Sequence, residues 1–303
     1  MTSFGIEYCF IFHHTTLIFR KNSVLLQHFV TRLKSYDNTY QDLFVRYASN
    51  PVLSAKDWPY PANTVFNPAA TSFQNKTLLL ARVEELDKWA ITYTAFPKSG
   101  PMVSLALTKD FTEFERMGSL LPPEDKDAAL FLRKINGKWI LIHRPVTVSG
   151  EPWMHIWASS SKDLQHWEGH RVLIPARAGA WWDANKVGLS AQPLETPDGW
   201  LILYYGMRQT AAGAIYRLGL VLLDLEDPFK ILHRSDEWIF WPQTIYEKKG
   251  DVGGAVFPCG WLLNPSAEKV RMYYGAADTC IALATANLSD LLQYISISNL
   301  VRK

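Results

Sequence analysis

Four copies of a two-run β pattern between residues 88 and 285 decide which folds this chain can adopt. The first run of each copy follows a turn, continues through apolar β-formers and ends in polar or aromatic residues. The first runs are 88–94, 138–144, 199–205 and 269–274, and the second runs are 103–111, 155–164, 217–225 and 279–285. One such unit cannot bury both of its faces, so repeats at this scale are typical of stacked blades. The sequence therefore predicts an all-β fold, a β-propeller.

The pattern also predicts how the chain is divided. Residues 1–46 show no clear period and are predicted to form an N-terminal extension, with the best candidate helix at 24–34. From residue 47 to 303 the chain is predicted to be the propeller domain. Short β-type runs separated by turn residues begin there.

Composition excludes several classes of function. The 31 basic and 29 acidic residues leave a net charge of +2, which argues against nucleic acid as a partner. Cys9, Cys259 and Cys280 lack the spacing of a zinc site or a disulfide framework, so no metal is expected. No apolar run approaches the roughly 18 residues of a membrane span, and no signal-peptide pattern occurs. A cytoplasmic protein without a membrane partner is expected.

Polar and aromatic residues gather where the first runs of the pattern end. If these ends meet at one mouth of a central channel, they form a binding pocket. The alternative is that they pack and hydrogen-bond between blades. The residues concerned are His143, Arg144, Tyr204, Tyr205, Tyr273, Tyr274 and Asp278.

A series of short motifs in fixed order, between Asn50 and Leu291, resembles a known family. Among them are Val65-Phe-Asn-Pro68, Leu80-Ala-Arg-Val-Glu84, Leu141-Ile-His-Arg-Pro145, Asn185-Lys-Val-Gly188 and Tyr273-Tyr-Gly-Ala-Ala-Asp278. The chain resembles glycoside hydrolase family 130, five-bladed β-propeller enzymes that act on β-mannosides. Most members are inverting phosphorylases, which convert a β-mannoside and phosphate into α-mannose 1-phosphate and a sugar. A smaller group are mannosidases.

The resemblance implies a site and its partners. A β-linked manno-oligosaccharide and phosphate would bind, with no cofactor other than phosphate as co-substrate, and a homo-oligomer is left open. Cationic side chains suit phosphate, because they supply charge-assisted hydrogen bonds. By resemblance, Asn67, Arg82 and Asp278 bind the mannosyl unit, and Arg144, Lys186 and Tyr216 bind phosphate.

Two departures from the family pattern limit this interpretation. No Asp-Pro-Arg run, the family's general-acid segment, occurs anywhere in the chain, so the first blade is expected to be incomplete and the catalytic residue stays unassigned. Tyr205 stands where the family usually has His. The expected function is thus a phosphorylase (a glycosyltransferase-type enzyme) impaired by the missing acid. The alternatives are an inactive mannoside-binding propeller or a β-mannosidase, which needs a second carboxylate. Asp127 and Asp183 are the carboxylates considered as replacements for the missing acid.

Overall fold

The computed structural model describes residues 8–12, 15–19, 42–57, 63–64, 70–73, 76–78, 82–83, 88–110, 113–146, 154–189, 191–211, 213–264 and 266–298. The chain divides into two compact units, Met1–Asp42 and Leu43–Lys303. In the first unit, β1 (Tyr8–Phe12) pairs antiparallel with β2 (Thr15–Phe19). The helix expected at 24–34 lies outside the described residues.

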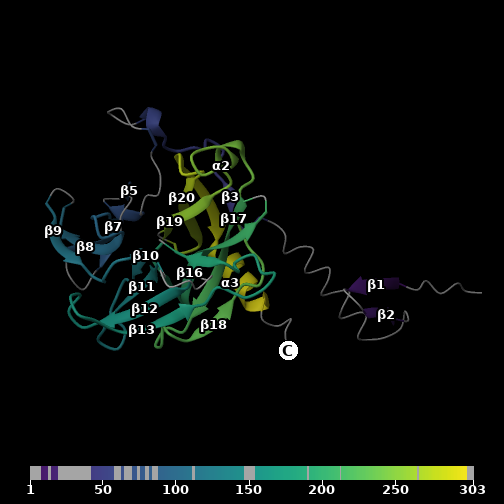
Figure 1. Ribbon diagram of the computed structural model, residues 1–303, viewed down its shortest axis with the longest axis horizontal. Coiled ribbons are helices and arrows are strands. Elements are labelled where there is room, and N and C mark those ends of the chain that lie inside the picture. Colours follow the sequence, from purple (N-terminus) through teal and green to yellow (C-terminus); the bar gives the residue numbers. More distant parts are fainter. Residues whose placement is uncertain are drawn as a thin grey trace, which may run out of the picture. The chain divides into compact units, whose positions relative to one another are not determined.

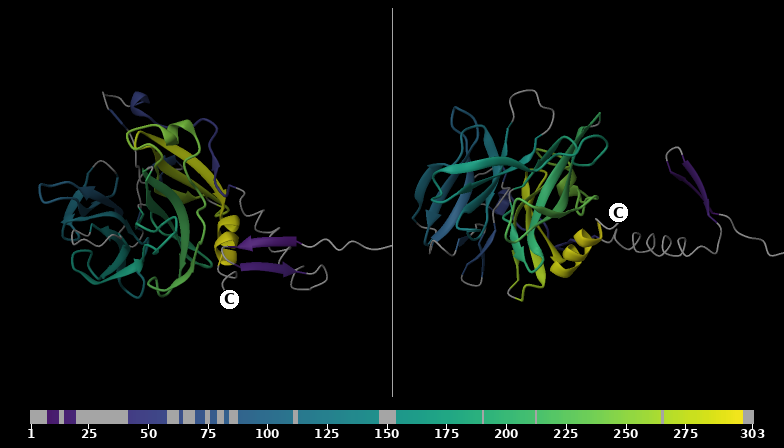
Figure 2. Two further views of the ribbon diagram at one scale, coloured as in Figure 1. Left: turned by 45° about the vertical axis from the view of Figure 1, so that its right-hand side comes forward. Right: turned by 90° about the horizontal axis from the view of Figure 1, so that it is seen from below.

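The second unit contains four antiparallel sheets in a propeller-like arrangement, which we call blades A to D (Figures 1 and 2). Blade A is β6 (Arg82–Val83), β7 (Lys88–Ala95), β8 (Met102–Thr108) and β9 (Glu115–Ser119). Blade B is β10 (Asp125–Leu130), β11 (Trp139–Pro145), β12 (Ile156–Ser161) and β13 (Trp167–Ile174). Blade C is β14 (Lys186–Gly188), β15 (Leu194–Thr196), β16 (Gly199–Thr210), β17 (Gly213–Leu223) and β18 (Ile231–Arg234). Blade D is β19 (Val256–Leu263), β20 (Lys269–Ala276), β21 (Cys280–Asn287) and β3 (Val45–Arg46).

The repeat read from the sequence coincides with these sheets. Its first runs are β7, β11, β16 and β20, each the second strand in the pairing order of its blade. Its second runs overlap β8, β12, β17 and β21, each the third strand in the pairing order of its blade. The all-β, propeller-like prediction is therefore confirmed. The described residues also include a hairpin of β4 (Thr71–Phe73) and β5 (Lys76–Leu78), the short helices η1 (Ala55–Asp57) and α2 (Ile245–Lys248), and α3 (Leu288–Ser298).

Apolar side chains fill the spaces between neighbouring blades, and β16 shows why its sequence is continuously apolar. Successive side chains of a strand point to opposite faces of the sheet. Trp200, Ile202 and Tyr204 join the core shared with blade B, whereas Leu201 and Leu203 join the core shared with blade D. A strand whose two faces are both buried can be apolar at every position and does not need to alternate apolar with polar residues.

Strand β3 completes blade D, although it lies more than 200 residues from its neighbour β21 in the sequence. Val45 pairs with Thr285, and the Arg46 side chain binds the fully buried carboxylate of Glu247, with Nε 2.8 Å from Oε1. The second compact unit begins at Leu43 and therefore includes this strand, which belongs to blade D. Of the helices that the structure describes, none combines the length and apolarity needed to cross a membrane.

Candidate functional site

Asp127 is the centre of a polar cluster at the meeting of blades B, C and D. It has φ of +53°, within a bulge of β10 between Lys126 and Ala129. Bulges re-aim side chains, and a non-glycine residue at positive φ is uncommon. Here its carboxylate Oδ2 accepts hydrogen bonds from Arg144 Nε at 2.7 Å and from the Tyr205 hydroxyl at 2.6 Å.

Tyr205 reaches Asp127 by passing directly over Gly188. A Cβ at Gly188 would lie 2.5 Å from the Tyr205 hydroxyl oxygen, so only glycine leaves room for this path. The Tyr205 ring also contacts Phe257 of blade D, with ring centroids 5.1 Å apart, and Tyr216 of blade C at 5.8 Å. The tyrosine therefore joins three blades at one point.

This packing predicts a measurable cost for Gly188→Ala. The added methyl group meets a buried ring that Asp127 holds in place, so we expect a loss of about 1–3 kcal/mol in the free energy of unfolding, as for other overpacked sites. Urea unfolding measures it. In a Tyr205→Ala background the methyl should cost almost nothing, because the atoms that it meets are gone. Equal costs in both backgrounds would contradict the proposed path.

Lys186 and Tyr216 extend the cluster. Lys186 Nζ donates to the Tyr216 hydroxyl at 2.9 Å and lies 5.1 Å from the centroid of the same ring. Met154 connects this pair to Arg144. The sulfur of Met154 lies 3.1 Å from Arg144 Nη1, and the backbone of Met154 forms an isolated parallel β-bridge with Lys186. The three residues assigned to phosphate from the sequence are thus brought together, and we call the group with Asp127 and Tyr205 the Asp127 cluster.

The cluster holds two cations and one carboxylate. Burial lowers the pKa of Arg144, but its interactions with Tyr205 and Asp127 outweigh that effect, so the pKa lies above its ordinary value and the guanidinium stays charged. Burial and the charge of Asp127 raise the pKa of Tyr205, which stays a neutral donor. The arrangement is therefore suited to an anion, which would balance the second cation.

Asp278 of blade D lies in the turn between β20 and β21. The residue is half-buried, with φ of +50°. Burial and the charge of Asp251 raise the pKa of its carboxyl, while Lys126 lowers it. Burial also raises the pKa of the Cys259 thiol, and the charges of Asp278 and Asp127 both add to that shift. Both carboxylates are therefore near the same buried thiol.

The other two residues assigned to the sugar are Asn67 and Arg82. Asn67 lies outside the described residues. Arg82 pairs with Trp89 between β6 and β7, and its side chain is outside the described part. Among the described residues, no group of three His, Cys, Asp or Glu is placed to hold a metal ion.

The prediction that all strand-end residues converge is wrong for three of them. His143 binds Asp125, Tyr204 binds Asp183 and Tyr274 binds Glu247, each within or between blades. Adjacent residues of a strand point to opposite faces, so Arg144 and Tyr205 enter the cluster while the preceding residues turn away. The alternative of packing and hydrogen bonding between blades holds for these three.

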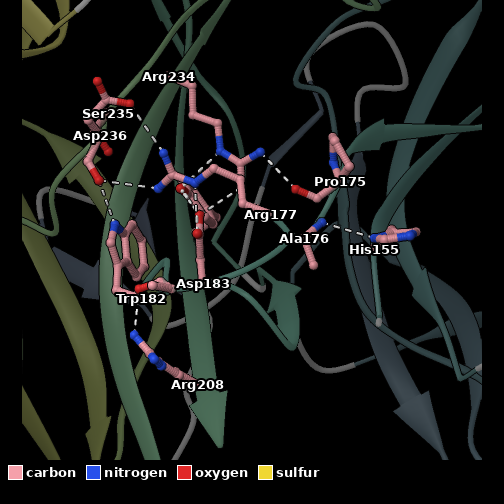
Figure 3. A network of polar contacts seen from close by, with 12 residues as sticks. His155, Pro175, Ala176, Arg177, Trp182, Asp183, Arg208, Arg234, Ser235 and Asp236 are labelled. Atoms are coloured by element: carbon pink, nitrogen blue, oxygen red, sulfur yellow. Dashed lines mark hydrogen bonds and ion pairs between the residues drawn. The ribbon is translucent and has the colours of Figure 1, made fainter. Parts of the chain in front are cut away.

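Asp183 is held in a separate, buried network (Figure 3). Its carboxylate accepts hydrogen bonds from Arg177 at 2.8 Å, Arg234 at 2.7 Å and Tyr204 at 2.9 Å. Trp182, beside it, donates to the backbone oxygen of Asp236 at 2.8 Å. Three donors on a fully buried carboxylate make Asp183 a structural anchor, which explains the polar run around it without a catalytic role.

Two features of the cluster could not be seen in the sequence. The bulge that aims Asp127 at Arg144 has no residue signature, and Met154 looked like any core methionine. Gly188 did carry a signal, since it ends the Asn185-Lys-Val-Gly188 motif.

Comparison with known proteins places the chain in a family. The model of the family described as beta-1,4-mannooligosaccharide phosphorylase, glycoside hydrolase family 130, matches residues 81–296. The chain belongs to this family. Family 130 proteins with similar sequences are a beta-1,4-mannooligosaccharide phosphorylase of Ruminococcus albus, 34% identical over 210 residues, and a beta-1,2-mannobiose phosphorylase of Listeria innocua, 36% identical over 247 residues.

These alignments cover only part of each family 130 relative. They include 69% and 81% of this chain but 62% and 65% of the two relatives, so the chain spans about three fifths of their length. Among solved structures, that of the Listeria innocua enzyme in complex with β-1,2-mannobiose superposes with a TM-score of 0.77 and 25% identity. This superposition covers 84% of this chain and 99% of that one. The propeller-like fold is thus shared with the family.

Proposed function

We propose that this chain binds a β-linked manno-oligosaccharide and phosphate, and that it catalyses phosphorolysis to α-mannose 1-phosphate slowly. Family membership and the names of the similar enzymes support the reaction class. Inorganic phosphate is the co-substrate, and no other cofactor is proposed.

The Asp127 cluster carries the phosphate part of this proposal. Arg144 and Lys186 come from different blades, yet Met154 and the Tyr205–Tyr216 ring pair hold them in one place. A single carboxylate balances only one of the two positive charges. Phosphate supplies the negative charge and the acceptor oxygens that such a pair binds.

The sugar part rests on Asn67, Arg82 and Asp278, which we propose as mannosyl-binding residues. The charges of Asp278 and Asp127 both raise the pKa of the buried Cys259 thiol, and burial and Asp251 raise the pKa of Asp278 itself. We also propose that the β4–β5 hairpin represents the incomplete first blade of a five-bladed propeller. The position of β4 beside β19 supports this, since a blade between A and D would lie there.

A specific observation favours the second candidate, a mannoside-binding propeller without activity. The chain has no Asp-Pro-Arg segment, and the two carboxylates considered as replacements are both engaged. Asp127 is bound by Arg144 and Tyr205, and Asp183 by two arginines and a tyrosine. An ionised, salt-bridged carboxylate has no proton to give to the leaving oxygen.

We therefore expect slow turnover. Loss of general acid catalysis costs roughly 10²–10⁴ in rate, so release of mannose 1-phosphate should lag behind the Listeria innocua enzyme by that factor. The assay uses β-1,2- and β-1,4-mannobiose, with and without phosphate, on both proteins. Binding without turnover would establish the inactive propeller, and phosphate-independent release of mannose would indicate a β-mannosidase. Turnover equal to that of the relative would overturn the assignment of Asp127 and Asp183 as non-catalytic.

A further inference from the structure

Four polar side chains form an unbroken line of hydrogen bonds across blade B. Asp125 on β10 binds His143 Nδ1 on β11 at 2.6 Å, and His143 Nε2 binds the Ser159 hydroxyl on β12 at 2.8 Å. Ser159 binds His170 Nδ1 on β13 at 2.6 Å, and His170 Nε2 binds the Trp167 carbonyl oxygen at 3.1 Å. The line therefore crosses every strand of the blade.

The two ends of the line differ in their surroundings. Asp125, His143 and Ser159 are all buried, with 3%, 2% and 0% of their surface exposed, whereas His170 is exposed. At the inner end, the second oxygen of Asp125, Oδ1, is buried and has no hydrogen-bond partner in the described part of the chain. An acceptor left without a donor at this depth is costly unless something reaches it.

The order Asp–His–Ser is also that of a hydrolase triad, but the geometry excludes that role. Ser159 is fully buried, and a second histidine occupies its other side. A nucleophile must reach a substrate, and this hydroxyl reaches only two imidazoles.

Counting protons shows what the line can do. Four hydrogen bonds need four hydrogens, and the Trp167 carbonyl can only accept. With Asp125 ionised and both imidazoles neutral, the line holds three: one on Ser159 and one on each ring. One further proton is needed to make every bond.

We propose that Asp125, His143, Ser159 and His170 form a proton-conducting line between the outer surface of blade B and its inner strand β10. The proton has three positions. With His170 doubly protonated, its Nδ1–H donates to Ser159, Ser159 donates to His143 Nε2, and His143 Nδ1–H donates to the Asp125 carboxylate. Transfer of the Nδ1 proton to Ser159, and of the Ser159 proton to His143, leaves His170 neutral and His143 doubly protonated.

A last transfer from His143 Nδ1 to Asp125 Oδ2 completes the path. Asp125 becomes a neutral acid and His143 keeps only its Nε2 proton. Every arrangement has four hydrogens in four bonds, and no bond between heavy atoms breaks. A proton taken up by the exposed ring is thus delivered to Asp125, two residues from Asp127, as the proton of a neutral carboxyl group.

Other charged groups around the line have partners of their own. Lys126 acts on Asp278, Arg144 binds Asp127, Lys138 binds Glu168, and Arg171 stacks on Phe229. On the neighbouring blade A, Lys88 of β7 binds Glu115.

Nitrogen-15 NMR of the histidine rings in the full chain tests this proposal. We expect the His143 and His170 signals to change together with pH, and the ring protons of His143 to exchange with solvent through His170. In His170→Gln and in Ser159→Ala the line is cut, so exchange at His143 requires local opening of the blade and slows at least about tenfold. His166→Gln is the matched control, since His166 is exposed and binds Asp163 within its own turn.

His170→Gln changes a surface residue and keeps a hydrogen-bond donor, so its result does not depend on whether Ser159→Ala folds. Unchanged exchange at His143 in His170→Gln would overturn the proposal. So would equal slowing in His166→Gln. Neither result bears on mannoside turnover, so this test is independent of the proposed function.

Discussion

Glu247→Ala should cost about 3–5 kcal/mol of the free energy of unfolding, because it removes one partner of a buried ion pair. Glu247 is fully buried and binds Arg46 of β3 through both carboxylate oxygens, at 2.8 and 3.1 Å. It also accepts hydrogen bonds from the Tyr274 hydroxyl and from two backbone amides. The substitution leaves the half-buried Arg46 without its carboxylate partner, at the strand that completes blade D. Urea unfolding measures the loss.

Glu195→Ala is the matched control for this prediction. Glu195 binds Arg133 at 2.8 Å, but both side chains are more than a third exposed, so this pair should contribute at most about 1 kcal/mol. If the two variants lose equal stability, the buried pair does not hold β3 to blade D.

The same carboxylate gives this prediction a pH dependence. Burial alone would raise the pKa of Glu247. The hydrogen bonds that its carboxylate accepts from Arg46, from the amides of Thr244 and Gln243 and from Tyr274 lower the pKa by more, so it lies below the ordinary value of 4.5. A group with a lowered pKa stabilises the fold above its ordinary pKa and stops doing so as the pH falls through its lower folded value. Wild-type stability should therefore fall on acidification below about pH 4.5, and Glu247→Ala should lose less over that range.

The blades could be predicted from the sequence because they are local. Each copy of the repeat pairs strands that are neighbours in the chain, so turn residues and apolar runs are enough to place β7, β11, β16 and β20. The partner of β3 could not be predicted, since that pairing joins Val45 to Thr285 and has no local signal.

The sequence singled out several residues of the Asp127 cluster, but not their geometry. The family resemblance named Arg144, Lys186 and Tyr216 as one set. It could not show on which face of its strand each of two adjacent residues lies. Tyr204 and Tyr205 are alike in sequence, yet one anchors Asp183 and the other binds Asp127. The two tyrosines differ because adjacent residues of a strand point to opposite faces of the sheet, and because the bulge in β10 turns Asp127 toward Tyr205. The position of a bulge depends on the packing around it, which the sequence does not show.

Arg144→Ala should weaken phosphate binding by about 1.5–3 kcal/mol, or roughly 10- to 150-fold, as for loss of a hydrogen bond to a charged group. Arg144 is 3% exposed and fixed by Asp127 and Met154, so its guanidinium is already oriented before an anion arrives. Titration calorimetry with inorganic phosphate measures the affinity without relying on turnover, and the KM for phosphate gives a second reading where turnover is measurable.

Comparison of variants separates a charge that binds phosphate from one that only balances Asp127. Arg144→Lys keeps the charge but not the planar donor set, so it should fall between wild type and Arg144→Ala. Lys186→Ala should weaken phosphate binding without disturbing the Arg144–Asp127 pair, and Arg133→Ala, on the surface, should leave the affinity unchanged. If Arg144→Ala and Lys186→Ala both stay folded and bind phosphate within about twofold of wild type, the two cations serve the packing of blades B and C alone. In that case the mannoside site has no phosphate partner in this cluster, and the chain is a sugar-binding propeller.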